Sequence, residues 1–395
     1  MKAVILAANN SPRLHPFTET RAKSMIRIGG RYILEYTLTA LGNAGVREVV
    51  IVVNHQQDSI RKFFGNGSPW GVRLEYVVQE PLSGIGHALK SCEPALEQQP
   101  FLLVYGDTLF HGNPFTSALS SYSQTGDPVA VIALPRSSQE FGNVYLDHEM
   151  RITRLVEKPE GAQANYVLAG VFVLPPQIFQ LLQTSQLDMA LALQQMVAKQ
   201  MKATIWEEGW IDIIYPWHIL EANRMLMDTW THSRIDSTAK FLGSVQIQGA
   251  VVVEADVVIE AGCVLKGPCF VGRGSYLGNN TLVRHYSAVG PQSIVGYGSE
   301  LKNCVIFGSA DLGRLSFIGD SVIGEQVQLG SGVTTVNHHW NQQTVSCRLR
   351  EGTIDTQLKK VGAFVGDRSV IGARHTLSPG LLVPSGTQHP DNLSL

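Results

Sequence analysis

The hydrophobic residues of this chain follow one pattern up to about residue 230 and a different pattern after about residue 240. In the first part, short runs of Val, Ile and Leu alternate with stretches of helical spacing. Runs without polar alternation are typical of strands buried on both faces of a sheet. Their alternation with helices predicts an α/β fold with a doubly wound, mostly parallel sheet. The expected strands are residues 2–8, 49–54, 74–79 and 101–105, and the expected helices are residues 33–45 and 86–96.

In the second part, aliphatic residues recur every six positions and are often followed by glycine. Neither an α-helix nor an amphipathic strand has this period. A hexapeptide β-helix has it, because each of three short strands per coil sends one aliphatic side chain inward and the turns favour glycine. The sequence therefore predicts a left-handed parallel β-helix. The periodic positions are Ile247, Val253, Ile259, Leu265, Val271, Leu277, Val283, Val289, Val295, Leu301 and Phe307, then, after a slip of register, Leu312 and Ile318, and later Val365, Ile371, Leu377 and Val383.

The length of 395 residues exceeds what one ordinary hydrophobic core supports, which favours two domains. We expect an α/β domain over residues 1–230 and a β-helix domain over residues 231–395. Helical spacing over residues 215–230 predicts a helix that links them, with its Met and Trp side chains in the core. The stretch 337–360 lacks the six-residue repeat and is expected to project from the coil as a loop.

Composition narrows the class of protein. The net charge of −2 gives no general reason to expect nucleic acid or an anionic membrane as a partner. No stretch approaches the 18 or so apolar residues of a membrane span, and the N-terminal apolar run is too short for a signal peptide. The five cysteines include no C-x-x-C pair, so we expect buried or incidental thiols in a reducing compartment. These features predict a soluble, cytoplasmic protein.

The residues that follow the first strand are candidates for chemistry, because ligands of doubly wound sheets bind at the carboxyl ends of the strands. The loop over residues 9–18 contains Arg13, and Lys23 follows shortly after it. A small-residue loop with two cations suits an anionic ligand, since exposed amides and basic groups converge there. Taken alone, such a basic loop is more often simply a solvated surface.

The order of motifs along residues 1–230 resembles that of the sugar-1-phosphate nucleotidylyltransferases, which have a Rossmann-like catalytic domain. The opening segment is similar to the family pattern L-A-A-G-x-G-T-R-L-x-P-x-T followed by P-K, and later segments resemble its base, metal and sugar motifs. The matching residues are Leu6, Ala7, Ala8, Arg13, Leu14, Pro16, Thr18 and Lys23, then Gln79 and residues 84–88, Gly106 and Asp107, Phe141 and Gly142, residues 156–159, Ala169 and Gly170, and residues 210–212.

The resemblance implies transfer of a nucleotidyl group from a nucleoside triphosphate to a sugar phosphate, with Mg²⁺ as cofactor. Arg13 and Lys23 are the expected catalytic cations, and Asp107 and Asp212 are the expected metal ligands. Gln79 can donate to and accept from a pyrimidine edge, which favours UTP or dTTP. The expected nucleotide-binding residues are Leu6, Ala8, Asn9, Ser11, Gln79, Gly84, Ile85 and Gly106. The expected sugar-phosphate-binding residues are Gly142, Glu157, Lys158 and Gly170.

Several positions depart from the family pattern. Asn9 and Ser11 replace the two loop glycines, and Pro12, which has no N–H to offer a phosphate, replaces a small residue. The charged residues are kept while the residues that shape the loop change. This favours an active enzyme with an unusual substrate over an inactive one. The alternative is a non-catalytic regulatory subunit that senses nucleotide sugars. Further departures are Ala22, Leu168 and Ile214.

The β-helix resembles that of bifunctional enzymes that acetylate an amino-sugar phosphate before uridylylation. Their motif places a histidine, the general base, where this chain has Arg314, which cannot accept a proton near neutral pH. Asn337 and Lys360 match supporting positions, and His338 and His339 are possible substitutes. The arginine argues against acyl-CoA-dependent transfer and for a scaffolding role. Coils of this kind commonly associate as trimers, so we expect a homo-oligomer, either a trimer or a multiple of it.

Overall fold

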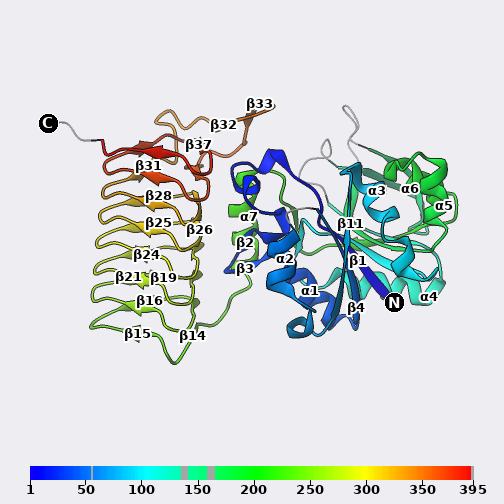
Figure 1. Ribbon diagram of the computed structural model, residues 1–395, viewed down its shortest axis with the longest axis horizontal. Coiled ribbons are helices and arrows are strands. Elements are labelled where there is room, and N and C mark those ends of the chain that lie inside the picture. Colours follow the sequence, from blue (N-terminus) through cyan, green and yellow to red (C-terminus); the bar gives the residue numbers. More distant parts are fainter. Residues whose placement is uncertain (55–56, 135–140, 158–164, 393–395) are drawn as a thin grey trace. The chain divides into compact units, whose positions relative to one another are not determined.

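The computed structural model describes residues 1–54, 57–134, 141–157 and 165–392 (Figure 1). The chain forms two compact units. The first, here called the sheet unit, comprises residues 1–10, 22–25 and 33–212, and the second, the coil unit, comprises residues 11–21, 26–32 and 213–395. Each unit therefore contains separate stretches of the sequence. The expected domain boundary at residue 230 stays a prediction.

The centre of the sheet unit is the expected parallel sheet. Its strands lie in the order β5-β4-β1-β6, and all three neighbouring pairs are parallel. The Val, Ile and Leu runs of β1, β4 and β6 are buried, as the absence of polar alternation predicted. The bounds are β1 (Lys2–Leu6), β4 (Glu48–Val53), β5 (Arg73–Val78) and β6 (Phe101–Tyr105).

An antiparallel extension continues the sheet beyond β6. Strand β11 pairs antiparallel with β6, β8 and β9, and β12 runs parallel to β8. The predicted α/β class is confirmed, and the sheet is mixed. The remaining bounds are β8 (Val129–Ala133), β9 (Asn143–Leu146), β10 (Ile152–Val156), β11 (Tyr166–Leu174) and β12 (Lys202–Trp206). Strands β7 (Thr108–Phe110) and β13 (Trp210–Asp212), which are far apart in the sequence, form a separate two-stranded antiparallel sheet.

Helices cover this sheet. Helix α3 packs on β1, and α4 packs on β8, β11 and β12. The expected helix over 86–96 is shorter than predicted: α3 ends at Lys90, and a 3-10 turn, Glu93–Leu96, follows, because Pro94 cannot continue an α-helix. The bounds are α1 (Ile33–Asn43), α2 (Gln57–Phe64), α3 (Gly84–Lys90), α4 (Pro114–Thr125), α5 (Ile178–Thr184) and α6 (Met189–Val197).

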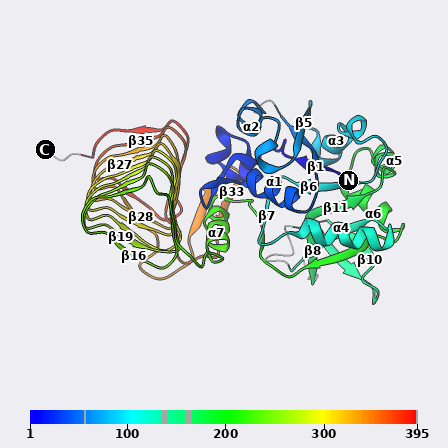
Figure 2. The same cartoon turned by 90° about the horizontal axis from the view of Figure 1, so that it is seen from below.

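The main body of the coil unit is the predicted β-helix. Its strands form three parallel sheets, in which each strand pairs with the equivalent strand of the next coil (Figures 1 and 2). Nearly all of the predicted aliphatic residues belong to one buried interior cluster, which runs from Val251 to Val383. Ile247, on β16, lies outside it and is 38% exposed. The hexapeptide period thus corresponds to one side of the coil.

The strands of the first sheet are β14 (Arg234–Ile235), β17 (Val251–Val253), β20 (Cys269–Val271), β23 (Ser287–Val289), β26 (Val305–Gly308), β29 (Val322–Glu325), β34 (Phe364–Val365) and β37 (Leu382–Val383). Those of the second are β15 (Lys240–Phe241), β18 (Val258–Ile259), β21 (Tyr276–Leu277), β24 (Ile294–Val295), β27 (Asp311–Leu312), β30 (Gln328–Leu329), β35 (Val370–Ile371) and β38 (Gln388–His389). Those of the third are β16 (Gln246–Gln248), β19 (Val264–Lys266), β22 (Leu282–Val283), β25 (Glu300–Lys302), β28 (Phe317–Gly319), β31 (Thr334–Thr335) and β36 (Thr376–Leu377).

The predicted interior position of Phe307 is also wrong. Val271 pairs with Val289, which is 18 residues further on, but Val289 pairs with Ile306, only 17 residues further on. The corner before β26 is therefore one residue shorter than the repeat, and Ile306 fills the interior in place of Phe307. Phe307 is buried elsewhere, with its ring centroid 5.1 Å from that of Phe17.

The insertion expected as a loop lies outside the repeat, and it contains a hairpin of its own. Strands β32 (Ser346–Leu349) and β33 (Gly352–Asp355) pair only with each other. The coil resumes when β29 pairs with β34, so that Ile323 lies beside Val365. The insertion therefore interrupts the sequence repeat without breaking the stack of coils.

Helix α7 (Pro216–Met227) and the hairpin of β2 (Arg27–Ile28) and β3 (Arg31–Tyr32) also belong to the coil unit. Asn223 of α7 is fully buried: its Oδ1 accepts from Gly29 N at 2.9 Å, and its Nδ2 donates to Tyr286 O at 2.8 Å. Trp217 and Met227 are buried, as predicted, whereas Met225 and Trp230 are only partly buried. No helix in the described part of the chain is long and apolar enough to cross a membrane.

The first testable property is the inertness of the thiols. All five cysteines are buried and unpaired. Burial raises the pKa of Cys92, Cys269, Cys304 and Cys347 to about 12, and only the thiolate is nucleophilic. We expect mass spectrometry to find no alkylation of these four by iodoacetamide at pH 8 in the folded protein, and full alkylation in urea. Rapid labelling of the folded protein would contradict the burial described.

Candidate active site

The candidate site lies at the carboxyl ends of β1 and β6. Strand β1 has β4 on one side and β6 on the other, so the chain changes direction across the sheet there. Such a switch point is where open α/β sheets bind their ligands. Gly106 follows β6 and donates to Leu6 O at 2.9 Å. A Cβ at this position would lie 2.8 Å from the same oxygen, so only glycine allows this approach.

Two carboxylates meet one buried ammonium at this edge. Lys23 Nζ donates to Asp107 Oδ2 at 2.9 Å and to Asp212 Oδ1 at 3.0 Å. The lysine side chain is 6% exposed, and the aspartates are 22% and 25% exposed. The two-stranded sheet of β7 and β13 brings the aspartates together, because Asp212 of β13 pairs with Thr108 of β7, the residue after Asp107. The sequence separation of 105 residues is thus closed by a short antiparallel ladder.

Lys23 keeps its positive charge although it is buried. Burial alone would lower the pKa of Lys23, but the charges and hydrogen bonds of Asp107 and Asp212 outweigh it and raise the pKa. The pKa of neighbouring Tyr105 is also raised, first by burial and then by Glu157 and the two aspartates. The lysine is therefore cationic and the phenol neutral throughout the physiological range of pH.

The aspartates fit the expected magnesium site. Both carboxylates lie within hydrogen-bond distance of a single nitrogen, so they are close enough to face one small cation. Mg²⁺ prefers oxygen ligands and is usually held by one or two carboxylates together with water and substrate phosphates. Within the described residues no group of three or more metal-ligating side chains occurs. The two aspartates and a bound polyphosphate would form such a site, and their role as metal ligands stays a prediction.

A pocket of about 330 Å³ opens beside Asp107. Gln79 is buried at its wall, with Nε2 donating to Gly84 O at 2.9 Å and lying 3.3 Å from His87 Nδ1. The structure thus brings six of the predicted nucleotide-binding residues, Leu6, Ala8, Asn9, Gln79, Gly84 and Ile85, to one cavity. Its full lining is Leu6, Ala8, Asn9, Asn10, Gln79, Leu82, Gly84, Ile85, Ala88, Tyr105 and Asp107.

Asn54, which the sequence analysis did not single out, supports this pocket. It is buried at the end of β4, and its Nδ2 donates to Ala8 O at 2.8 Å and to Asn10 Oδ1 at 3.0 Å. These bonds hold the loop after β1. The signal in the sequence was a polar residue directly after the apolar run Val-Val-Ile-Val-Val, at a strand end that the predicted topology places beside β1.

The predicted sugar-binding residues gather next to Tyr105. A Cβ on Gly142 would lie 3.1 Å from Glu157 Oε2, and one on Gly170, whose φ is +77°, would lie 3.0 Å from Tyr105 Cδ2. Both glycines therefore make room for neighbours that line this region. Lys158 lies outside the described residues, so its predicted role is untested.

Ser11 and Arg13 belong to the coil unit, apart from the other predicted residues. Ser11 has φ 42° and ψ 64°, the left-handed conformation that glycine adopts most easily, and its carbonyl accepts from Thr18 Oγ1 at 2.8 Å. Arg13 Nε donates to Glu351 Oε2 at 2.8 Å, and both side chains are about half exposed. The serine thus adopts the backbone conformation expected of the family glycine it replaces.

Two β-helix residues singled out in the sequence lie at different corners of the coil: Asn337 follows β31 of the third sheet, and Arg314 follows β27 of the second sheet. Asp320, after β28, lies at the same corner as Asn337. Asp320 is buried and accepts from Asn303 Nδ2 at 2.7 Å and from Asn337 Nδ2. His338 Nδ1 lies 3.0 Å from Asn337 Oδ1, and Arg314 is exposed. The pairing of His338 with Asn337 fixes a histidine near this buried aspartate.

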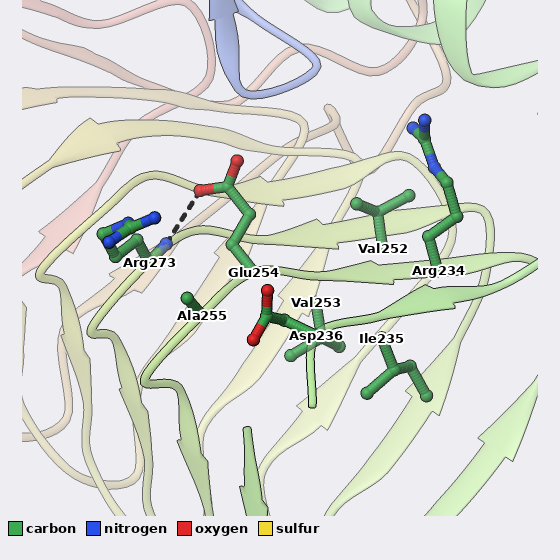
Figure 3. Close-up of a pocket in the computed structure, with 8 residues that line it drawn as sticks. All are labelled: Arg234, Ile235, Asp236, Val252, Val253, Glu254, Ala255 and Arg273. Carbon is green, nitrogen blue, oxygen red and sulfur yellow. Dashed lines mark hydrogen bonds between the residues drawn. The ribbon is translucent and has the colours of Figure 1, made fainter. Parts of the chain in front are cut away.

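A separate pocket of about 380 Å³ lies on the first coils of the β-helix (Figure 3). Figure 3 shows Glu254 accepting from the backbone N of Arg273 in the next coil, at 2.9 Å. None of the predicted site residues lines this pocket.

Comparison with known proteins identifies the family. The family described as nucleotidyl transferase matches residues 2–229, and the chain belongs to it. A Methanocaldococcus jannaschii protein named bifunctional protein GlmU is 31% identical over 98% of this chain and 92% of its own length. A Sulfurisphaera tokodaii protein named bifunctional sugar-1-phosphate nucleotidylyltransferase/acetyltransferase is 28% identical over 97% of this chain and 94% of its own.

The fold of the catalytic part is shared with solved structures. A UDP-glucose pyrophosphorylase from Acinetobacter baumannii superposes with a TM-score of 0.52 and 21% identity, over 56% of this chain and 91% of that one. At this identity the likeness concerns the fold. The relatives' bifunctional names leave the sequence-based argument against acetyl transfer without support.

Removal of the buried ammonium tests the charge cluster. Replacing Lys23 with Met leaves two carboxylates without their shared cation, and we expect a loss of about 3 kcal/mol in the free energy of unfolding at pH 7. The pKa of Lys23 is raised in the folded state, so this stabilisation is complete below about pH 10.5 and is lost as the pH rises through the higher folded value.

Urea denaturation of wild type and the Lys23→Met variant from pH 6 to 11 measures this difference. The control is Lys90→Met, which removes the partly exposed pair with Glu93 and should cost less than about 1 kcal/mol. Equal losses for the two variants at pH 7, or a Lys23 difference that grows with pH above 10.5, would contradict the assignment.

Proposed function

We propose that this chain transfers a nucleotidyl group from a nucleoside triphosphate to a sugar 1-phosphate, releasing pyrophosphate. The observation that carries the proposal is Lys23 held by Asp107 and Asp212 beside a nucleotide-sized pocket. The names of relatives that align over nearly the whole chain support the sugar-phosphate acceptor.

The reaction requires cations more than an acid–base pair. A phosphate oxygen of the sugar 1-phosphate attacks the α-phosphorus, and the bond from that phosphorus to the oxygen bridging it to the β-phosphorus breaks. The electron pair leaves with pyrophosphate. Both reactants are anionic and charge accumulates on the departing group, so catalysis consists mainly of positioning and charge neutralisation. Lys23 can supply a fixed positive charge at the transferred phosphate, and Arg13 is proposed to hold the triphosphate.

Asp107 and Asp212 are proposed to hold Mg²⁺. When bound, the ion would supply neutralisation of the polyphosphate and polarisation of the α-phosphate. The aspartates also orient Lys23, because each accepts one of its three N–H bonds. The donor set of two carboxylates suits a hard divalent cation that completes its coordination with substrate oxygens.

Gln79 is proposed to read the base. Its Nε2 donates to Gly84 O and lies 3.3 Å from His87 Nδ1, so we propose that a bound base replaces the His87 contact and meets this N–H together with the amide oxygen, as the edge of a pyrimidine requires. This supports uridine or thymidine. Glu157 is proposed to accept from a sugar hydroxyl, and Lys158 to meet the sugar phosphate, with Gly142 and Gly170 giving access.

The left-handed backbone of Ser11 favours activity over a purely sensing role. The loss of both loop glycines motivated the alternative of a regulatory subunit. Ser11 adopts the left-handed conformation for which glycine is favoured, which supports an active loop at this one position. We further propose that the protein works in the cytoplasm, with residues 1–230 catalytic. We also propose that it self-associates through the β-helix, where Ile294, Tyr297 and Leu315 are exposed.

Acyl transfer in the β-helix is a second candidate function. It is supported by the bifunctional names of both relatives and by the pairing of His338 with Asn337. A neutral imidazole can accept the proton of an attacking amine, a step that Arg314 cannot perform. His338 is the proposed base.

A screen of nucleoside triphosphates against phosphorylated sugars, with Mg²⁺, tests the primary function through pyrophosphate release. We expect turnover with UTP or dTTP. Asp107→Asn and Asp212→Asn should each lower kcat at least about 100-fold, because each removes charge from the reacting centre. The control is Asp58→Asn on the exposed face of α2, which should match wild type. The function is rejected if wild type releases no pyrophosphate with any pair, or if Asp107→Asn retains full activity.

Release of free coenzyme A thiol from acetyl-CoA and an amino-sugar phosphate tests the second function. We expect His338→Ala to abolish the release, because it removes the only proposed proton acceptor. Gln79→Ala, which alters only the nucleotide pocket, should leave acyl transfer unchanged. Full activity of the His338→Ala variant would exclude the proposed base, and absence of thiol release by wild type would exclude acyl transfer from these substrates.

A further inference from the structure

Residues 11–21, here called the anchored segment, join the pocket loop to Lys23. The segment belongs to the coil unit, whereas residues 1–10 before it and residues 22–25 after it belong to the sheet unit. Asn9 of the pocket lies two residues before the segment, and Lys23 lies two residues after it. What holds the anchored segment therefore restrains two parts of the proposed nucleotidyl-transfer site through the chain itself.

A carboxylate of the β-helix holds the end of this segment. Arg21 bonds through Nη2 to Asp367 Oδ2 and to Glu325 Oε2, the latter at 3.0 Å, and the hydroxyl of Thr20 donates to the same Asp367 oxygen. The other oxygen, Asp367 Oδ1, accepts from the backbone N of Glu325 at 2.7 Å. The side chains of Arg21 and Asp367 are 9% and 5% exposed. Both oxygens of Asp367 are thus used in a buried network.

Aromatic packing fixes the same segment on the coil. The ring of Phe17, fully buried, lies edge-on to Phe307 at 5.1 Å and to Phe364 at 6.4 Å between centroids. The guanidinium of Arg21 lies 5.0 Å from the centroid of Phe307. Phe307 comes from β26 and Phe364 from β34, and Phe307 is the residue displaced from the interior by the short corner. A cation over an aromatic face adds attraction to the ion pair.

The middle of the segment is tied as well. Glu19 accepts from the backbone N of Ser385 at 2.9 Å, and the Ser385 hydroxyl donates to Pro16 O at 3.2 Å. The anchored segment therefore contacts four coils through charged, aromatic and backbone groups. A buried ion pair adds little net stability compared with apolar residues of the same volume, because desolvation of the charges offsets their attraction. What the network provides is one fixed geometry.

We propose that Asp367 is a positioning residue for nucleotidyl transfer: through Arg21 and Thr20 it holds the anchored segment and so restrains Lys23 and the pocket loop. The inference rests on the proposed function. Only Ala22 separates Arg21 from Lys23, so few backbone dihedrals are available to absorb a displacement. A misplacement of about 1 Å at a reacting centre can cost about 100-fold in rate.

The test compares Asp367→Asn, Arg21→Gln and the double variant with wild type in full-length protein. Asn keeps the acceptor for Glu325 N but removes the charge that holds Arg21. The matched control is Glu254→Gln, since Glu254 likewise accepts from a backbone N of a neighbouring coil (Figure 3). None of the interactions described above for the anchored segment involves Glu254. Two readouts are needed: kcat/KM for pyrophosphate release, and amide hydrogen exchange at residues 22–25, where Met25 N donates to Ala22 O at 2.9 Å.

We expect Asp367→Asn and Arg21→Gln each to lower kcat/KM about tenfold to 100-fold and to accelerate exchange at residues 22–25. The double variant should be no worse than the worse single one, since both act through one contact. Glu254→Gln should change neither readout. If Asp367→Asn does not fold, Arg21→Lys, which keeps the charge but not the forked geometry, should give a smaller loss of the same kind.

Two outcomes overturn the proposal: unchanged exchange at residues 22–25 in the Asp367 and Arg21 variants, or an active wild type whose Asp367→Asn variant keeps full kcat/KM. Additive losses in the double variant would also overturn it. If wild type turns over no substrate, the proposed function fails by itself. Hydrogen exchange then still decides whether Asp367 restrains the segment that contains Lys23.

Discussion

The proposed chemistry of this protein depends on one electrostatic feature: two carboxylates share one buried ammonium. Asp107 and Asp212 both contact the nitrogen of Lys23, and without it these two carboxylates would repel each other. Lys23, in turn, would lose its hydration without compensation if it were buried alone. Together they form a cluster of one positive and two negative charges, with a net charge of −1, and its aspartates are partly exposed. An arriving polyphosphate and a divalent cation can exchange partners with the cluster without creating an unpaired buried charge. This is the property that a phosphate-transferring site requires.

The fold supplies this cluster from three separate places. Asp107 comes from the end of β6, Asp212 from the ladder between β7 and β13, and Lys23 from a 3-10 turn, Lys23–Met25. The glycines around it have the complementary role of leaving space: Gly106 lets β1 and β6 approach, and Gly170 accommodates Tyr105. We propose that the charged residues carry the chemistry and that the glycines leave the space into which the reactants fit.

Much of the fold follows from local patterns in the sequence. Strand β6 has the predicted bounds, because an unbroken apolar run between polar residues has one natural interpretation. The positions that the period of six identified, apart from Ile247 and Phe307, belong to the interior cluster of the β-helix. Phe307 was misplaced because omission of one residue at a corner leaves no mark in a run of apolar side chains. The antiparallel strands beyond β6 were not predicted, since pairing direction depends on tertiary contacts.

The site residues likewise fall into those that local sequence patterns identify and those whose role depends on tertiary contacts. Asp107, Gln79 and Gly84 could be found because strand ends and motif order identify them, whereas Asn54 was missed because its role depends on a neighbouring strand. The contact between Arg21 and Asp367 spans 346 residues and has no local pattern at all.

Electron paramagnetic resonance of Mn²⁺ with a non-hydrolysable triphosphate analogue tests whether the two aspartates hold a metal ion together with a polyphosphate, because the signal of the free ion reports metal binding without turnover. We expect the wild-type protein to deplete the signal of free Mn²⁺ and the Asp212→Asn variant to restore this signal. Equal depletion by both proteins would show that the metal and polyphosphate bind elsewhere, and would contradict the account.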